Sequence, residues 1–385
     1  MRSFISVFKR NVTNAADSTK FRTANFPTAL IAFFLFSLPL AGFFWDCDTC
    51  RPLVENRKLA PFPAARFEFS SPDKIPSEWN SYLTDHFPFR NCLIYWGKLF
   101  RFFVLQVSTN DSVILGRDHW LYFNIDGGVE SFKNRLPYTE KDLSKWLDFI
   151  SEVKKRLVPT GAKFYILIAP NSQTLYPEHL PRSIVKERPG SRLDTLKYYL
   201  LQHGFEIIDP RDTLLEAKKR QKVYQPTDTH WTEWGAFYTY QLLFQRIAKD
   251  FPAQKPKEAR DFTISNSTTS GGDLSRLLGV SHILNRPVVK FTPKVQKEMT
   301  MQYSDSSNAD GKSLCPTCGR LRAVLIGDSF AGALLPFIRS HFNYVRVLMS
   351  FYVDWKVIQA EQPDIFIYEI VERRLDSHPP PHFLE

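Results

Sequence analysis

The chain has 385 residues, of which 43% are hydrophobic and 15% aromatic, so it can bury a large core and is not intrinsically disordered. Its formal charge of +10 would attract an acidic polymer, a membrane surface or nucleic acid. Because it has neither a dense Lys/Arg stripe with interleaved aromatic residues nor a nucleic-acid-binding motif, we expect no nucleic-acid partner.

The chain begins with a short basic tail that is followed by a long uncharged run. Residues 1–22 carry five basic side chains against one acidic side chain, and residues 23–45 carry no charge. An uncharged run of this length spans a bilayer, and the basic flank predicts that the tail stays in the cytoplasm. A cleaved signal peptide is the alternative, but no clear small-x-small cleavage site stands before Phe43. We therefore predict one retained transmembrane helix with the rest of the chain outside the cytoplasm.

The five cysteines include two C-x-x-C pairs, Cys47 with Cys50 and Cys315 with Cys318. Two such pairs can hold zinc, but these lie far apart in the sequence, one beside the predicted anchor and one in a polar loop. A thioredoxin-like site should open a helix after a strand, whereas C-P-T-C precedes a predicted strand. Outside the cytoplasm local disulfides are expected, so we predict no metal site, with zinc as the minor alternative.

The segment between the anchor and the main domain is predicted to be a Pro- and Arg-containing connector, followed by an aromatic helical segment from Tyr82 to Val107 that packs on the main body. Thr139 to Asp142 reads as a capping box, and apolar residues recur behind it at helical spacing up to Gly161. The predicted organisation is a tail over 1–22, an anchor over 23–45, the connector and aromatic segment over 46–135, and a catalytic domain over 136–385.

Short apolar runs alternate with helical segments in the rest of the chain. The expected strands are 164–169, 205–208, 323–326, 345–349 and 365–370; the expected helices are 193–202, 234–249 and 331–342; and the expected polar loops are 253–272 and 302–319. Short buried strands that alternate with helices predict an α/β fold with a doubly wound parallel sheet.

The first chemical motif is Gly327-Asp328-Ser329, which follows the apolar run 323–326 and precedes small residues that begin a helix. This order places Ser329 at the carboxyl end of a parallel strand, where open α/β sheets bind their ligands. Gly327 permits a tight turn, and backbone N–H groups at the start of the helix can face an oxyanion. Asp328 or Ser329 could instead simply cap the helix.

The second motif is Asp228-Thr229-His230-Trp231, just before an amphipathic helix. A serine hydroxyl needs an imidazole to take its proton, and the imidazole needs a carboxylate to orient it. Asp228 and His230 lie two residues apart on a short loop, which lets the Asp228 carboxylate reach His230 Nδ1. Trp231 follows directly and could line one side of the active-site pocket. Together the two motifs favour a Ser329–His230–Asp228 triad over a helix cap and an ordinary histidine.

These motifs resemble those of the SGNH hydrolase superfamily, with the serine block last instead of first. The reversed order and the D-T-H-W block are similar to the periplasmic alginate O-acetyltransferase family of the AlgJ and AlgX type. Supporting segments lie at 55–63, 85–90, 116–121, 175–178, 272–274 and 371–373. The resemblance implies an SGNH-hydrolase-like fold with reordered catalytic motifs, with Ser329 as nucleophile, His230 as general base and Asp228 as its orienting acid.

The resemblance also implies the cellular location, the reaction and the partners of the chain. The chain would be a single-pass inner-membrane protein with a periplasmic catalytic domain, and it would need no cofactor. It would transfer acetyl groups to hydroxyls of an exported polysaccharide and receive them from a multi-spanning membrane acyltransferase. A secreted carbohydrate esterase or deacetylase with the same triad, and a non-catalytic subunit of a polysaccharide-modification complex, remain open alternatives, because sequence does not separate transfer from hydrolysis.

Weaker candidates for contact with the substrate or its oxyanion are Gly327, Asp328, Trp231 and Tyr352, and the family's remaining oxyanion-hole donors cannot be placed. The pairs Glu178-His179 and Asp118-His119 could be metal ligands, but no third ligand has a recognisable spacing, so loop positions are the better interpretation.

Overall fold

The computed structural model describes residues 28, 30, 31, 33, 34, 37, 58–63, 74–125, 127–295, 297–303, 310–377 and 383–384. The basic tail, most of the predicted anchor and the first C-x-x-C pair lie outside these residues. Within the described part of the chain, no helix is long and apolar enough to cross a bilayer. The chain divides into two compact units, Met1–Leu105 and Gln106–Glu385.

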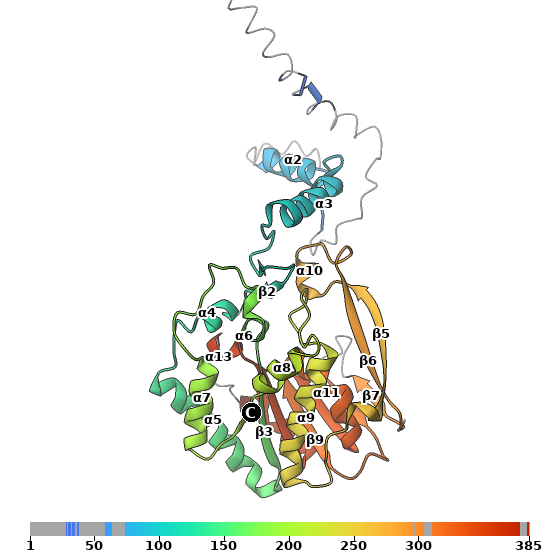
Figure 1. Ribbon diagram of the computed structural model, residues 1–385. Helices are drawn as coiled ribbons and strands as arrows, with labels where there is room; N and C mark the ends of the chain where they lie inside the picture. The colour runs from blue at the N-terminus through green and yellow to red at the C-terminus, as the bar shows by residue number, and fades with distance from the viewer. Residues whose placement is uncertain are drawn as a thin grey trace, which may run out of the picture. The chain divides into compact units, whose positions relative to one another are not determined.

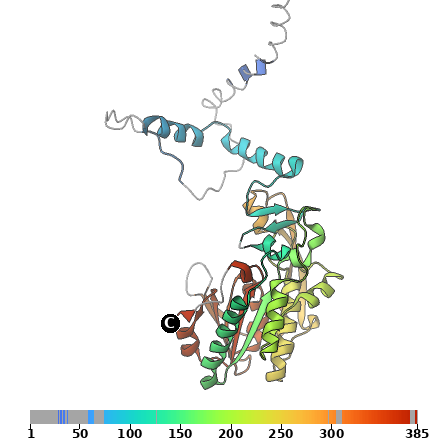
Figure 2. The ribbon, with the colours of Figure 1, turned by 90° about the vertical axis from the view of Figure 1, so that its left-hand side faces the viewer.

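The first unit contains helix α2 (Lys74–Asp85) and helix α3 (Arg90–Phe100), which continues as the π-helical turn η1 (Arg101–Leu105). The aromatic helical segment predicted from Tyr82 is therefore two separate helices (Figure 2). The break falls at Pro88, because a proline disfavours helical conformation in the residue before it. Phe89 then adopts a left-handed conformation with φ 62°.

The second unit is built on a seven-stranded sheet with the order β4-β3-β12-β9-β10-β8-β7. Its parallel part consists of β4 (Ile207–Ile208), β3 (Lys163–Ala169), β12 (Ile365–Val371), β9 (Arg322–Gly327) and β10 (Tyr344–Met349). The strands β8 (Gly311–Leu314) and β7 (Thr300–Tyr303) extend it antiparallel. The sheet is thus mixed, and the prediction of a parallel sheet is correct for five of its strands.

Helices cover both faces of this sheet (Figure 1). One face packs against α5 (Glu140–Leu157), α7 (Arg192–Gln202) and α12 (Trp355–Glu361), and the other packs against α8 (Arg211–Lys218), α9 (Glu233–Asp250) and α11 (Ser329–Ile338). Because successive strand residues point to opposite faces, Leu325 joins one core and Ile326 the other. The strands are therefore buried on both sides, as their continuous apolar runs predict.

Smaller elements lie around the sheet and the helices that cover it. They are the hairpin β1 (Val113–Leu115) and β2 (Leu121–Phe123), the ribbon β5 (Phe262–Ser270) and β6 (Asn285–Pro293), the pair β11 (Val353–Asp354) and β13 (Phe383–Leu384), and the short helices α4 (Gly128–Lys133), α6 (Ser172–Leu175), α10 (Asp273–Leu277) and α13 (Arg374–Ser377). Because the hairpin belongs to the second unit, that unit begins at Gln106, upstream of the boundary at 136 that the sequence suggested.

The structure corrects both predicted polar loops. The first, over 253–272, contains β5, whose residues after Phe262 are all exposed. The second, over 302–319, contains β8 and the end of β7 at the edge of the sheet. Ribbon and edge strands do not need two apolar faces, so their Ser, Thr and Lys residues resembled a loop.

The second C-x-x-C pair forms a local disulfide between Cys315 and Cys318, as predicted, and both residues are buried. Cys92 in α3 is disulfide-bonded as well. These findings agree with an oxidising compartment.

A buried histidine on the α9–α11 side makes stability depend on pH. The Tyr240 hydroxyl lies 2.7 Å from His341 Nε2, and Gln254 Oε1 lies 3.2 Å from Nδ1. Burial, together with the charges of Lys257 and Lys297, lowers the pKa of His341 to about 3.

We expect acid to destabilise the fold through His341. Below pH 6.5 the unfolded chain protonates this ring and the folded chain does not, so stability falls by about 2 kcal/mol by pH 5. Unfolding free energies of His341→Gln measured between pH 7 and 5 should fall less steeply than those of the wild type. The exposed His203→Gln should follow the wild type, and parallel curves for His341→Gln and wild type would contradict the assignment.

Candidate active site

The serine motif forms the turn between β9 and α11, in the middle of the sheet. Chain direction across the sheet reverses here, because β9 leads through α11 to β10, and β10 leads back through α12 to β12 on the other side of β9. Such switch points are where open α/β sheets bind ligands. Ser329 is the first residue of α11 and is exposed.

Asp328 caps α11, as the alternative interpretation held. Its Oδ1 accepts a hydrogen bond from Phe330 N (2.9 Å), and its Oδ2 accepts one from Val371 N at the end of β12 (3.0 Å). Both oxygens are thus occupied by backbone donors, and the residue is buried. Asp328 fixes the turn, and the next residue, Ser329, is left to face solvent.

Only glycine fits at position 327, because a side chain there would collide with its neighbours. A Cβ there would lie 2.8 Å from Glu369 Oε2 and 2.8 Å from the Ala331 Cβ. Glu369 is fully buried under the turn and accepts a hydrogen bond from Asp328 N (3.2 Å). Burial and the nearby charge of Asp328 raise the pKa of Glu369 well above its usual value. Sequence reasoning missed Glu369 because it lies inside the apolar strand β12.

The Asp-His motif lies on the loop between α8 and α9. A bridge between Tyr224 and Trp231 closes this loop, and Thr232 then caps α9 by accepting a hydrogen bond from Gly235 N (3.1 Å). These contacts hold Asp228 and His230 in a short rigid turn. Asp228 is buried, whereas His230 is partly exposed.

The structure brings the three predicted triad residues together from these two loops. His230 Nε2 lies 2.7 Å from Ser329 Oγ, and His230 Nδ1 lies 2.7 Å from Asp228 Oδ1. The hydroxyl can therefore donate to Nε2 while Nδ1–H donates to the carboxylate. This is the arrangement in which an imidazole can take the serine proton.

Asp273 and Arg286 also contact Asp228. Its Oδ1 also accepts from His230 N (3.1 Å), while Oδ2 accepts from Asp273 N (3.4 Å) and lies 3.3 Å from the Arg286 guanidinium. Gly272 is needed here because a Cβ would lie 2.4 Å from Asp228 Oδ2. Segment 272–274 supports the family resemblance in the sequence but has no role assigned there, and Arg286 belongs to no motif that the sequence reveals.

These contacts keep Asp228 ionised. Burial alone would raise its pKa, but the hydrogen bonds from His230 and the charges of His230 and Arg286 hold it well below the usual value. The neighbouring Asp273, whose Oδ2 lies 3.7 Å from His230 Nδ1, has its pKa raised by burial and by repulsion from Asp228. The stronger acid is thus the one that holds the histidine.

Aromatic side chains form the base of the site. The Phe330 ring contacts both His230 and Trp231, with centroid distances of 5.0 Å each, and the Arg373 guanidinium lies 5.7 Å from the Phe330 centroid. Trp231 is buried and packs edge-on against Phe330, so it supports the ring that contacts His230. Tyr352 lies exposed in the loop after β10, at the carboxyl edge of the same sheet.

The other candidate groups do not form a comparable site. Asp228, His230 and Asp273 could together approach a cation, but the Arg286 guanidinium already occupies the open side of Asp228. His179 Nδ1 contacts Asp118 (2.8 Å), and its ring stacks on Trp120 at 4.9 Å. This second Asp–His pair is therefore packed in the β1–β2 region, as expected for loop residues.

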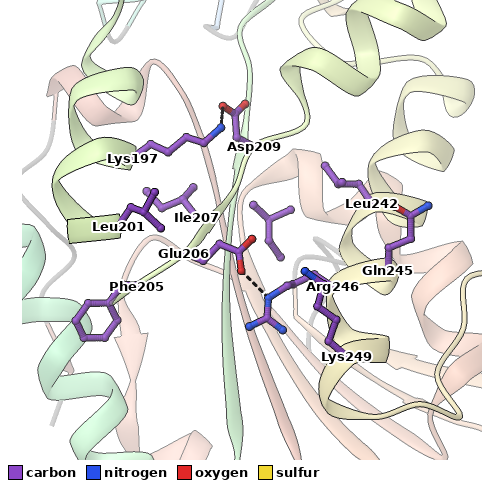
Figure 3. Close-up of a pocket in the computed structure, with 11 residues that line it drawn as sticks. Lys197, Leu201, Phe205, Glu206, Ile207, Asp209, Leu242, Gln245, Arg246 and Lys249 are labelled. Atoms are coloured by element: carbon purple, nitrogen blue, oxygen red, sulfur yellow. Dashed lines mark hydrogen bonds and ion pairs between the residues drawn. The ribbon is translucent and has the colours of Figure 1, made fainter. Parts of the chain in front are cut away.

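A cavity of about 340 Å³ lies beside the edge strand β4, between α7 and α9 (Figure 3). Four of its charged groups form two ion pairs, Lys197 with Asp209 (3.0 Å) and Arg246 with Glu206 (2.8 Å). None of the triad residues lines it.

We expect Arg286→Gln to move the acid limb of the pH–activity profile upward by about one pH unit. The acid limb reports protonation of the general base, and removal of the nearby Arg286 charge favours the protonated base by this order. The matched control is Arg246→Gln, because Arg246 is equally buried and ion-paired but lies in the cavity beside β4. Equal shifts in the two variants would exclude a role for Arg286 at the site.

Comparison with known proteins places this geometry in a family. The model described as "SGNH hydrolase-like domain, acetyltransferase AlgX" matches residues 113–360. A protein named "Probable alginate O-acetylase AlgJ" from Pseudomonas syringae pv. tomato is 26% identical over 279 residues, which cover 69% of this chain and 70% of the relative. Its namesake from Pseudomonas putida is 25% identical over 282 residues, which cover 68% and 70%.

Solved structures share the fold. Bacillus cereus PatB1 superposes with a TM-score of 0.54 at 17% identity, over 70% of this chain and 98% of that one. A DHHW family protein from Eubacterium siraeum gives 0.50 at 14% identity, over 69% and 95%. The family match covers more than half of the chain, including the whole Asp-His loop and the serine turn. The chain therefore belongs to the family of SGNH hydrolase-like acetyltransferase domains of the AlgX type, and it is an O-acyltransferase.

Proposed function

We propose that this chain transfers acetyl groups to hydroxyls of an exported polysaccharide through an acyl-enzyme on Ser329. The observation that carries the proposal is the continuous chain of contacts from Ser329 Oγ through His230 to Asp228, with 2.7 Å at each step. The exposure of Ser329 at the carboxyl edge of the sheet supports it, because a polymer can reach the hydroxyl there.

In the acylation half, Ser329 Oγ attacks the carbonyl carbon of an acetyl ester while His230 Nε2 takes the hydroxyl proton. Asp228 stabilises the resulting imidazolium without accepting its proton. The backbone N–H of Ser329, in the first turn of α11, is the oxyanion donor that the proposal assigns. The tetrahedral intermediate then collapses, and His230 returns the proton to the departing alcohol.

In the deacylation half, an acceptor hydroxyl loses its proton to His230 Nε2 and attacks the acetyl-Ser329 carbonyl. The Ser329 Oγ–acyl bond breaks, and Ser329 Oγ takes the proton back from His230. The acceptor leaves as its acetyl ester, and the enzyme is regenerated. Water in place of the acceptor would give hydrolysis, so the outcome depends on how well an acceptor displaces water.

The names of the relatives suggest the polymer. Because they are named for alginate acetylation, we propose a secreted polysaccharide of this kind as the acceptor. The proposal includes a multi-spanning membrane acyltransferase as the acyl donor. It also includes an inner-membrane anchor over residues 23–45, which would place the catalytic unit in the periplasm.

We expect an acetyl group to accumulate on Ser329 when the chain is incubated with an activated acetyl ester and no acceptor. Deacylation then depends on water alone, so the covalent intermediate should persist. Mass spectrometry of the quenched protein would locate the label, and added oligosaccharide should remove it with formation of acetylated sugar. Label on another residue would refute the nucleophile, and release as acetate at the same rate with or without oligosaccharide would favour the esterase alternative.

A further inference from the structure

A continuous apolar stripe runs along α3 and η1 on their exposed side. It consists of Leu93, Trp96, Phe100, Phe103 and Val104, each between 46% and 64% exposed. The first four follow one another at steps of three or four residues, and Val104 lies four residues after Phe100. This spacing places them on one helical face. Soluble proteins rarely expose a contiguous apolar patch of this kind, so the stripe indicates an interaction surface.

The charges around the stripe are all of one sign. Arg90 lies three residues before Leu93 and Arg101 three residues before Val104, so at helical spacing both fall beside one edge of the apolar stripe. Between Asp85 and Asp111 the sequence contains no acidic residue. A helix with an apolar face of Trp, Phe and Leu and a basic border is the type that lies in the interface of an anionic membrane.

The side of η1 opposite the stripe is the packed one. Phe102 is buried, and its ring contacts Phe103 at 4.9 Å. The stripe is therefore additional to the packing of the unit. The surface does not match an acidic polysaccharide, because a polar polymer would leave Trp96, Phe100 and Val104 in water.

We propose that the stripe formed by Leu93, Trp96, Phe100, Phe103 and Val104 rests on an anionic lipid surface, with Arg101 beside the headgroups. The helix then lies in the plane of the interface with its aromatic side chains among the upper acyl chains. This surface is separate from the triad. It would hold the first unit flat on the membrane whether or not Ser329 is the nucleophile.

The test uses the full chain in vesicles of phosphatidylglycerol and phosphatidylethanolamine, and in vesicles of phosphatidylcholine. Photoreactive benzoylphenylalanine replaces Trp96, or Val158 in the second unit as a control of similar exposure. We expect several-fold more lipid adducts from position 96 than from 158. The excess should fall several-fold in phosphatidylcholine and in the variant Arg101→Gln, since each basic residue near an anionic surface adds about 1 kcal/mol, or about fivefold.

Three outcomes would overturn the proposal. Adducts from position 96 with peptides of residues 106–385 would mean that the chain itself covers the stripe. Adducts with a second copy would mean self-association, and equal lipid labelling at 96 and 158 would mean no docking. Turnover of a soluble acetyl ester, which does not involve these residues, should be unchanged in every variant and so reports a correctly folded chain.

Discussion

Ser329→Ala and His230→Ala should each lower acyl transfer by on the order of 10⁴-fold or more, and the double variant should be little worse than either. The two groups act as one unit, because the hydroxyl stays protonated without the imidazole and the imidazole has nothing to activate without the hydroxyl. The measurement is initial acetylation of an oligosaccharide by the three variants and the wild type. Ser329 is exposed, so its substitution leaves no unpaired buried group and the fold should survive.

The control is Ser151→Ala, an exposed serine on α5 in the same unit, which should retain full activity. Additive losses for Ser329 and His230 would mean that they act independently, and near-normal turnover by Ser329→Ala would bring forward the non-catalytic subunit interpretation. Circular dichroism should show the same melting transition for all of these variants.

Asp228→Asn should lower transfer by on the order of 10³-fold, less than loss of the serine or the histidine. An amide cannot satisfy this site in either orientation. Its NH₂ would face His230 Nδ1–H on one side, or the Arg286 guanidinium and Asp273 N–H on the other. The first orientation drives His230 into the tautomer that carries its proton on Nε2, where it cannot accept from Ser329.

The chain supplies a matched control for this variant in the second Asp–His pair. Asp118 contacts His179 Nδ1 at 2.8 Å, nearly the same distance as in the triad, but the ring stacks on Trp120. Asp118→Asn should leave activity unchanged. Nitrogen-15 NMR of the histidine rings should show altered protonation at His230 only in Asp228→Asn; an unaltered His230 tautomer with full activity would refute the orienting role.

The parallel part of the sheet was predictable because its signal is local. Runs such as 164–169 and 365–370 are apolar throughout, as strands buried on both faces must be, and the observed strands β3 and β12 differ from them by a residue or two. The polar strands β5 and β8 were not predictable, because their stability comes from pairing with β6 and β10 and not from their own composition.

The same distinction applies to the site. Ser329, His230 and Asp228 could be proposed from the sequence because each stands in a short motif whose spacing suits the chemistry, and the structure brings them within hydrogen-bond distance. Arg286 and Glu369 could not be proposed, since Arg286 lies in the β5–β6 ribbon and Glu369 within a buried strand. Only the fold brings Arg286 to Asp228 and Glu369 under the serine turn. Asp273 had a recognisable neighbourhood, but nothing in the sequence links it to Asp228 across 45 positions.

The position of β12 in the sheet affects how the chain folds during its synthesis. This strand lies between β3 and β9 in the sheet, although it is the last of the seven in the sequence. A nascent chain that ends before residue 365 holds β3 and β9 without the strand that joins them, and it lacks the Val371 N–H that anchors Asp328. Pairings between such distant segments form late and slowly. The serine turn is therefore completed only after residue 371 has emerged, and we expect shorter chains to be unable to take up activated acetyl groups.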